Sequence, residues 1–515
     1  MAQGRKKVLW VDDEIEFLRS HIMFLETRGY SVTPTFSGDD AIELIHKNPQ
    51  GYDIVLLDEQ MPGKDGLTTL EEIKALLPDM PVVMVTKSEE EQLMEDALGK
   101  KIDGYLTKPV NPSQILSVCK RLIDARQIMS SQLSQQFVRS YSENRQIVGN
   151  PMDARGWERL YENFTRWDVE LAAIDDEGLR QMHAGQKSDS NAAYADFIEA
   201  HYGRWIRGND NPPPLAVQVM ERFVFPQMQN NRRVCVVVLS GLRFDQFNAI
   251  EALCRPHYSV QRHTFFSILP TMTPYARSAL FAGCFPLELQ QRSPELWQAV
   301  MAGKTDVYGT LLDQTFEKLG LKQSRPSPYY AIRSNEEAAA VLQTIATLGQ
   351  VPLCSMVVDV LSMAAGPSLL QQLAPDEPAL RSFTMSWFQH SPVFQILKEL
   401  GRLGSTVVLA SDHGSILCSR GTDVYGAPDL NADSRCLFGT NMTCDERHAI
   451  FLSDPSAYRL PHAVEGETCI IAKENFYFKR TESFDKYNRT YRNVFLSGGI
   501  SMEEMIMPLA ILTPK

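Results

Sequence analysis

The 515-residue chain lacks three features that would narrow its class at once: cysteine pairs, an excess of basic residues and a long apolar run. Its nine cysteines are scattered without a CxxC pair, which excludes a zinc ribbon and suggests no disulfide framework. The net charge of −12 argues against a broad nucleic-acid-binding surface. No apolar run approaches membrane-spanning length, and acidic residues come too early for a signal peptide. We therefore expect a reduced, cytoplasmic protein with two or three domains.

The N-terminal third does contain a regular alternation of apolar strands and amphipathic helices. Predicted strands occupy residues 7–11, 31–36, 53–58, 81–86 and 104–108, and helical patterns occupy residues 15–29, 39–47, 67–77 and 89–99. Strands separated by helices predict right-handed βαβ units and a doubly wound parallel sheet. In such sheets the functional groups gather at the carboxyl ends of the strands.

Polar residues follow successive strands of this predicted sheet: Asp12, Asp13, Asp58, Thr86 and Lys108. Three carboxylates on one edge would repel one another, so a hard cation such as Mg²⁺ is their natural partner. A hydroxyl and an ammonium on the same edge can bind an oxyanion beside that cation. Helix capping is the alternative for any one of these residues. Five such positions together favour a site that accepts a phosphoryl group on Asp58.

Residues 7 to about 125 resemble a response-regulator receiver domain, through the motifs VDDE, LLDEQMPGKDG, VTKS and YLTKPVNP. The resemblance implies a CheY-like fold in which a sensor histidine kinase phosphorylates Asp58. It implies Mg²⁺ ligands from Asp12, Asp13 and the backbone carbonyl of Gln60. It also implies that Thr86 and Lys108 contact the phosphoryl group, that Tyr105 is the switch aromatic, and that the Lys108–Pro109 bond is cis.

The sequence pattern in the middle of the chain predicts a helical connector. Residues 115–146 contain no glycine or proline, and further helical patterns cover residues 156–174 and 189–206. A break follows at Pro212, Pro213 and Pro214. We place a receiver domain at residues 1–125, a helical bundle at 126–208 and a third domain at 209–515. The connector either transmits a receiver signal or acts as a passive spacer. No compact basic helical unit follows it, which disfavours a DNA-binding output domain.

The sequence pattern of the third domain predicts a second, larger α/β sheet. Its apolar strands cover residues 234–239, 263–269, 354–360, 406–410, 449–452, 468–472 and 508–512. The polar residues at or after the ends of these strands are Ser240, Thr271, Asp359, Asp412 and His413. Thr271 precedes a helix that begins near Thr273 and Pro274, where free backbone N–H groups favour phosphate chemistry, although a threonine there is commonly a cap.

The motifs LSGLRFDQF, PTMTPYARSALFAG, ASDHGSI and SGGISMEEMIMPLAIL resemble the PglZ branch of the alkaline phosphatase superfamily. The order of receiver, helical bundle and PglZ domain resembles the PorX proteins of Bacteroidota, response regulators linked to type IX secretion. That superfamily binds two zinc ions and uses a Thr or Ser nucleophile, which implies that role for Thr271. The resemblance also implies homodimerisation on phosphorylation.

The zinc ligands implied by this resemblance are incomplete. Asp412 and His413 match the first zinc site and Asp359 matches the second. Ser240 stands where the family has Asp, and Met363 and Ser497 stand where it has His, so three of seven expected ligands are altered. Serine and methionine are poor ligands for Zn²⁺. His448 and His462 are candidate substitutes.

Without two cations, Asp359 and Asp412 need hydrogen bonds or a cationic partner, for which Arg243 and Arg277 are candidates. We expect a response regulator with a degenerate PglZ-like output domain that either has a structural role or binds a nucleotide or other phosphate-containing ligand. The alternative is a zinc-dependent phosphodiesterase acting on nucleotides or oligonucleotides, with Thr271 as nucleophile.

Overall fold

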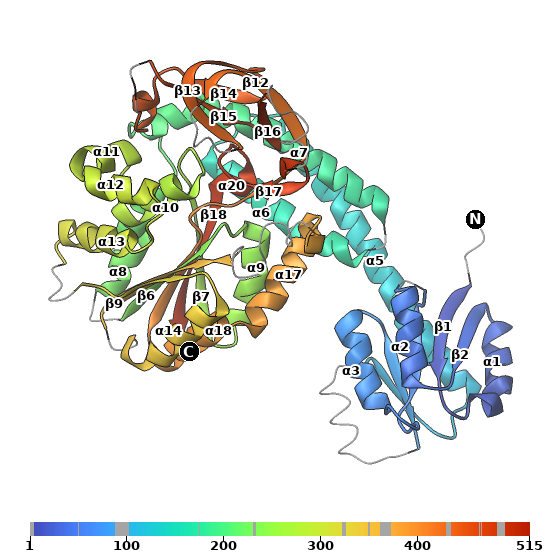
Figure 1. Ribbon diagram of the computed structural model, residues 1–515. Coiled ribbons are helices and arrows are strands. Elements are labelled where there is room, and N and C mark those ends of the chain that lie inside the picture. The colour runs from blue at the N-terminus through green and yellow to red at the C-terminus, as the bar shows by residue number, and fades with distance from the viewer. Residues whose placement is uncertain are drawn as a thin grey trace. The chain divides into compact units, whose positions relative to one another are not determined.

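The computed structural model describes residues 5–49, 51–87, 102–174, 176–229, 233–321, 326–348, 351–360, 372–428, 434–462, 464, 466–480 and 490–515. The chain forms two compact units, Met1–Arg139 and Ser140–Lys515 (Figure 1). All nine cysteines are free thiols. No helix within the described ranges is long and apolar enough to cross a membrane.

The first unit contains a five-stranded parallel sheet with the order β2-β1-β3-β4-β5. Its strands are β1 (Lys6–Val11), β2 (Tyr30–Thr35), β3 (Ile54–Asp58), β4 (Val82–Thr86) and β5 (Gly104–Thr107). All five predicted strands are present, and the doubly wound topology is confirmed. β1, β3 and β4 are almost entirely buried because helices cover both faces of the sheet.

Helices η1 (Ile15–Leu18), α1 (Arg19–Glu26) and α5 (Pro112–Val148) contribute apolar side chains to one face, and α2 (Gly38–Lys47) and α3 (Gly66–Leu76) to the other. Two of these helices begin at side-chain caps that satisfy free backbone N–H groups. Ser37 accepts from the backbone N–H of Asp40, and Asp65 accepts from that of Thr68. The predicted helix at 89–99 lies outside the described residues.

The second unit contains a six-stranded sheet with the order β7-β18-β10-β6-β9-β8. Its strands are β7 (Tyr258–Phe266), β18 (Ile506–Pro514), β10 (Thr406–Ala410), β6 (Val234–Ser240), β9 (Leu353–Asp359) and β8 (Tyr329–Ile332). β10, β6, β9 and β8 are parallel, whereas β18 is antiparallel to both of its neighbours. Helices α10 (Thr273–Ala282) and α13 (Val307–Lys318) pack on one face, and α9 (Phe244–Cys254), α14 (Asn335–Leu348) and α18 (Pro392–Arg402) on the other.

Two strands that we predicted for this large sheet lie elsewhere. β14 (Ala449–Leu452) and β15 (Thr468–Ala472) belong to a separate five-stranded sheet with the order β14-β15-β13-β12-β16. The other strands there are β13 (Cys436–Thr443), β12 (Arg420–Pro428) and β16 (Phe476–Arg480). An apolar run indicates that a strand is buried but does not indicate which sheet buries it. A short ribbon of β11 (Ile416–Cys418) and β17 (Val494–Leu496) is also present.

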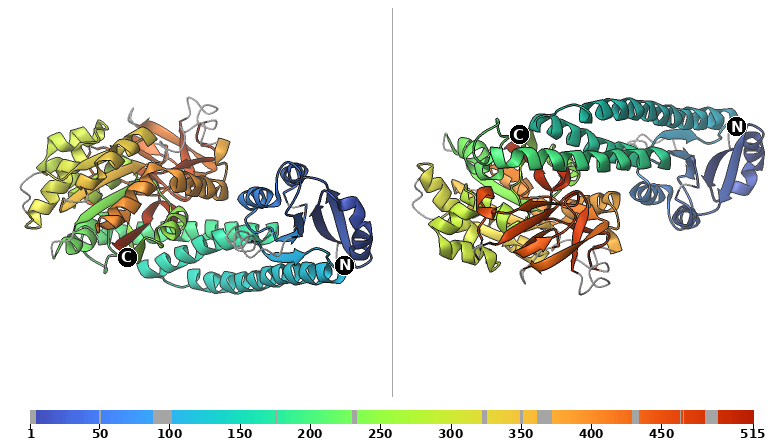
Figure 2. Two further views of the ribbon diagram at one scale, coloured as in Figure 1. Left: turned by 90° about the horizontal axis from the view of Figure 1, so that it is seen from below. Right: turned by 90° about the horizontal axis from the view of Figure 1, so that it is seen from above.

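The predicted connector consists mainly of helices, and its later helices pack into the second unit. α6 (Ala154–Glu170) and α7 (Glu177–Trp205) follow the long α5 (Figure 2). Trp157, Tyr161, Phe164 and Tyr194 from these helices lie in the same apolar core as residues of the six-stranded sheet. The connector helices and the α/β domain therefore share one core.

Candidate functional site

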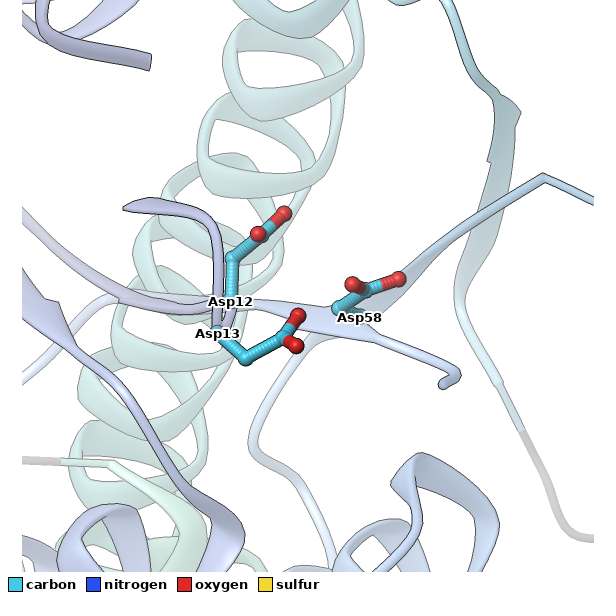
Figure 3. A group of neighbouring side chains, drawn as sticks. All are labelled: Asp12, Asp13 and Asp58. Carbon is cyan, nitrogen blue, oxygen red and sulfur yellow. The ribbon is translucent and has the colours of Figure 1, made fainter. Parts of the chain in front are cut away.

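The carboxyl ends of β1 and β3 bring three carboxylates together at one edge of the first sheet. Asp12 and Asp13 follow β1, Asp58 ends β3, and oxygen atoms of the three lie within 4.8 Å of one another (Figure 3). Asp12 and Asp58 are buried, whereas Asp13 is exposed. Within the described ranges no other group of three or more His, Cys, Asp or Glu side chains is close enough to share a metal ion.

The side chain of Lys108 places a positive charge at this acidic edge. It follows β5, and its Nζ lies 2.8 Å from an oxygen of Asp12 and 2.8 Å from Oδ2 of Asp58. The peptide bond between Lys108 and Pro109 is cis, as the receiver resemblance implied. Burial acts to raise the pKa of Asp58, and the hydrogen bond from Lys108 acts to lower it; the net shift is upward. Burial acts to lower the pKa of Lys108, but its bonds to Asp12 and Asp58 give a net rise.

The residues at this edge fit a magnesium ion. Mg²⁺ prefers oxygen ligands and is commonly held by one or two carboxylates together with water and phosphate oxygens. Three carboxylates with one ammonium leave an excess of negative charge that a divalent cation would offset. Gln60, whose carbonyl is the further predicted ligand, lines a cavity of about 580 Å³ together with Asp13.

The two predicted switch residues lie on neighbouring strands of the same sheet. Thr86 ends β4 and is fully buried, and Tyr105 in β5 is half-buried against the apolar cluster beneath α2 and α3. The hydroxyl of Thr86 donates a hydrogen bond to Oε2 of Glu59, the residue that follows Asp58. The sequence pattern gives no signal for this contact of Glu59, because a charged residue after a strand usually faces solvent and no motif connects it with Thr86.

At the edge of the six-stranded sheet, Ser240 and Asp412 contact each other and share an arginine. Ser240 Oγ donates to Asp412 Oδ2 at 3.0 Å, and Arg277 Nε donates to the same oxygen at 2.9 Å. Arg277 also donates from Nη2 to Ser240 Oγ. The other Asp412 oxygen accepts from the backbone N–H groups of Gly241 and His413. Burial acts to raise the pKa of Asp412, but His413 and Arg277 together hold it below its ordinary value.

The remaining candidates of the first zinc site are also bound to protein groups. Thr271 is fully buried; its Oγ1 donates to the carbonyl of Gly499 and accepts from the N–H of Gly498, both at 2.9 Å. His413 contacts Thr273 Oγ1 through Nε2 at 2.8 Å, and the carbonyl of Gly414 through Nδ1.

Among the residues that the structure describes, the candidates of the second zinc site are not part of any group of three metal-ligating side chains. Asp359 is half-buried and pairs in register with Ser240 on the neighbouring strand. Ser497 is half-buried just before Gly498, and Met363 lies outside the described residues. Of the two substitute histidines, His448 stacks on the Phe476 ring and bonds Thr422, and His462 contacts Ser456.

Arg243, the other cation that we considered for Asp359 and Asp412, binds elsewhere. Its guanidinium pairs with Asp245 at 3.0 Å and Glu377 at 2.9 Å.

The side chains of the first zinc site do not fit a zinc ion in this arrangement. Arg277 already neutralises Asp412, a serine replaces the expected carboxylate, and Thr271 and His413 are committed to other bonds.

Three family models match the chain in succession. They are the response regulator receiver domain over residues 8–120, the PorX response regulator linker domain over 127–206, and the BREX system PglZ alkaline phosphatase-like domain over 219–512. The chain is 31% identical over 115 residues to Two-component system protein A of Emericella nidulans, a match that covers 22% of this chain and 17% of that protein. It thus spans less than a fifth of that curated relative.

Similar solved structures cover the N-terminal part of the chain. A CheY-like receiver domain protein from Methanospirillum hungatei JF-1 is 30% identical, with a TM-score of 0.23, and the match covers 24% of this chain and 96% of that one. A chain of the CheX-CheY-BeF3-Mg+2 complex from Borrelia burgdorferi is 27% identical with a TM-score of 0.22, covering 23% and 90% of the two chains.

The parallel sheet ending in Asp12, Asp13 and Asp58, together with the receiver match, defines a response regulator whose receiver is followed by a helical linker and a large α/β domain. Because the third family model covers more than half of the sequence, the chain belongs to the PglZ alkaline phosphatase-like family, in a PorX-like arrangement of domains.

Proposed function

We propose that a sensor histidine kinase phosphorylates this response regulator on Asp58. The observation that carries the proposal is the convergence of Asp12, Asp13, Asp58 and Lys108 at one sheet edge. An oxygen of Asp58 attacks the phosphorus of the phosphohistidine, the bond from phosphorus to the histidine nitrogen breaks, and an acyl phosphate forms. Bound Mg²⁺ would neutralise the charge of the phosphoryl oxygens.

The side chains around Asp58 have separate tasks in this proposal. Asp12, Asp13 and the carbonyl of Gln60 hold the cation. Lys108, already 2.8 Å from Asp58, pairs with a phosphoryl oxygen once the acyl phosphate has formed. Thr86 donates its hydroxyl to the phosphoryl group, and Tyr105 follows the movement of Thr86. This gives the receiver two states that the phosphoryl group biases.

We further propose that phosphorylation drives symmetric homodimerisation of the receiver (residues 1–125) and that the connector (126–208) passes the change to the output domain (209–515). The run of helices α5, α6 and α7 supports a physical connection between receiver and output. The match to the PorX linker supports a role in regulating type IX secretion, and the receiver match supports action in the cytoplasm beside a kinase.

We propose that the output domain acts by binding or assembly and does not hydrolyse phosphodiesters. The burial of Thr271 and its two hydrogen bonds support this, because an attacking hydroxyl must reach the phosphorus of a substrate. Zinc analysis of the purified chain and an assay with bis(p-nitrophenyl) phosphate test the proposal. Two bound zinc ions with hydrolysis that Thr271→Val abolishes would establish the alternative phosphodiesterase function.

Sedimentation velocity tests the phosphorylation proposal directly. Acetyl phosphate with Mg²⁺ should shift the full-length protein toward a dimer, and mass spectrometry should place one phosphoryl group on Asp58. Asp58→Ala should abolish both effects. Asp79→Ala, an exposed aspartate in the same unit, is the matched control and should behave as the wild type. An unphosphorylated wild-type protein would refute the assignment of Asp58, and a phosphorylated monomer would refute dimerisation alone.

A further inference from the structure

Glu59 occupies a position in the receiver that brings its side chain into contact with the phosphorylation switch. The hydroxyl of Thr86 donates a hydrogen bond to Oε2 of Glu59. Both residues are buried, with 0% of Thr86 and 8% of Glu59 exposed. A carboxylate that is largely removed from water gains from such a bond, which is stronger than one between neutral groups.

The backbone of Glu59 is held in place on both sides. Its N–H donates to the carbonyl of Val85 at 3.1 Å, and its own carbonyl accepts from the N–H of Gly66 at 2.8 Å. Gly66 is needed for this approach, because a Cβ at that position would collide with the carbonyl oxygen of Asp58. Any displacement of the Glu59 carboxylate must therefore come from rotation of its side chain.

Space for that rotation is present beside the site. Glu59 lines the cavity of about 580 Å³ that Asp13, Gln60 and Met61 also border. The cavity is open to solvent, so a carboxylate turned into it would be hydrated. The cost of releasing Thr86 is consequently the loss of one hydrogen bond and not the burial of an unpaired charge.

Phosphorylation of Asp58 sets up a competition for Thr86. A threonine hydroxyl has one proton to donate, so it can serve the Glu59 carboxylate or a phosphoryl oxygen but not both at once. The phosphoryl group also adds negative charge close to Glu59, which repels its carboxylate.

We propose that Glu59 is a positioning residue that holds the Thr86 hydroxyl in the unphosphorylated receiver and releases it when Asp58 is phosphorylated. The inference rests on the proposed phosphorylation of Asp58. Glu59 thereby raises the free energy of the activated state relative to the resting state. It sets a threshold for switching, and its own atoms take no part in phosphoryl transfer.

Beryllium fluoride with Mg²⁺, a mimic of the phosphoryl group, provides the test on the full-length chain by isothermal titration calorimetry. We expect Glu59→Ala to bind it roughly threefold to tenfold more tightly than the wild type, since one competing hydrogen bond is lost. Glu59→Gln keeps an acceptor for Thr86 without the charge and should lie between the two. Circular dichroism checks that each variant is folded.

Two comparisons separate this role from a general charge effect. Glu14→Gln removes an exposed carboxylate that pairs with Lys87 near the same edge, and it should leave the affinity essentially unchanged. In a Thr86→Ala background, Glu59→Ala should have no further effect, because the proposed role acts through that hydroxyl. An affinity gain that persists in this background, or equal affinities of Glu59→Ala and the wild type, would overturn the inference. Absence of beryllium fluoride binding to the wild type would overturn the proposed phosphorylation as well.

Discussion

Replacing Arg277 by methionine should destabilise the second unit strongly. The guanidinium is the cationic partner of Asp412, which is fully buried, and it also binds Ser240. Methionine fills similar space but leaves the Asp412 carboxylate buried without its guanidinium partner. Removing one member of a buried ion pair typically costs about 3–5 kcal/mol. Loss of the guanidinium should also move the pKa of Asp412 upward from its lowered value, because burial acts in that direction and Arg277 is one of the groups that oppose it.

Urea denaturation followed by tryptophan fluorescence measures this cost, because five of the six tryptophans lie in the second unit. The double variant Arg277→Met with Asp412→Asn should recover most of the lost stability, since the amide oxygen still accepts from Gly241 and His413 while no charge is stranded. Arg402→Met, which removes an exposed ion pair in the same unit, should cost less than about 1 kcal/mol. A cost below about 1 kcal/mol for Arg277→Met, or a double variant as unstable as the single one, would show that Arg277 is not needed to neutralise Asp412.

Three further predictions concern the same unit. Gly414→Ala should destabilise it by about 2–3 kcal/mol, because the new Cβ would collide with the carbonyl oxygen of Glu503. Gly185→Ala, in an open position of α7, should stabilise it by about 0.5–1 kcal/mol, and urea midpoints of the two variants compare the effects directly. Burial acts to raise the pKa values of Glu377 and Asp412, but cationic neighbours hold them below their ordinary values of 4.5 and 3.8. These two carboxylates therefore contribute fully to the stability of the folded unit above about pH 5. Their contribution is lost as the pH falls through the pKa values of the folded state. Urea midpoints measured from pH 7 down to pH 3 should therefore decline below about pH 4.5, and a constant midpoint would contradict this.

The receiver could be predicted from sequence because its signal is local and regular. Each strand is a short apolar run, each helix has its own periodicity, and the parallel topology places Asp12, Asp13 and Asp58 on one edge by geometry alone. Lys108 follows from the same rule. Glu59 does not, because its contact with Thr86 depends on side-chain rotation between two strands, which leaves no periodic signal.

In the PglZ-like domain, the strand ends could be predicted from sequence, but the side-chain partners and the sheet to which each strand belongs could not. The strand ends at Ser240 and Asp412 could be predicted, and loss of the expected carboxylate at Ser240 argued against zinc. The choice of Arg277 over Arg243 as the partner of Asp412 could not be predicted. Arg243 lies closer to a strand end, just after β6, but the packing of α10 brings the guanidinium of Arg277 to that carboxylate. Membership of β14 and β15 in a separate sheet likewise depends on long-range pairing.

The shared core of the connector helices and the α/β domain has a consequence for how this protein can be divided. The sequence break at Pro212 to Pro214 suggests a convenient place to cut. Lys187 of α7, however, is buried against Glu377 at 2.8 Å and Glu503 at 3.4 Å, both on the far side of that break. A fragment that begins after the prolines would expose apolar surface and leave those carboxylates without their ammonium partner. The smallest fragment of the second unit that folds alone should therefore start near Ser140. The linker helices and the PglZ-like domain must accordingly be kept together in any truncation or domain exchange.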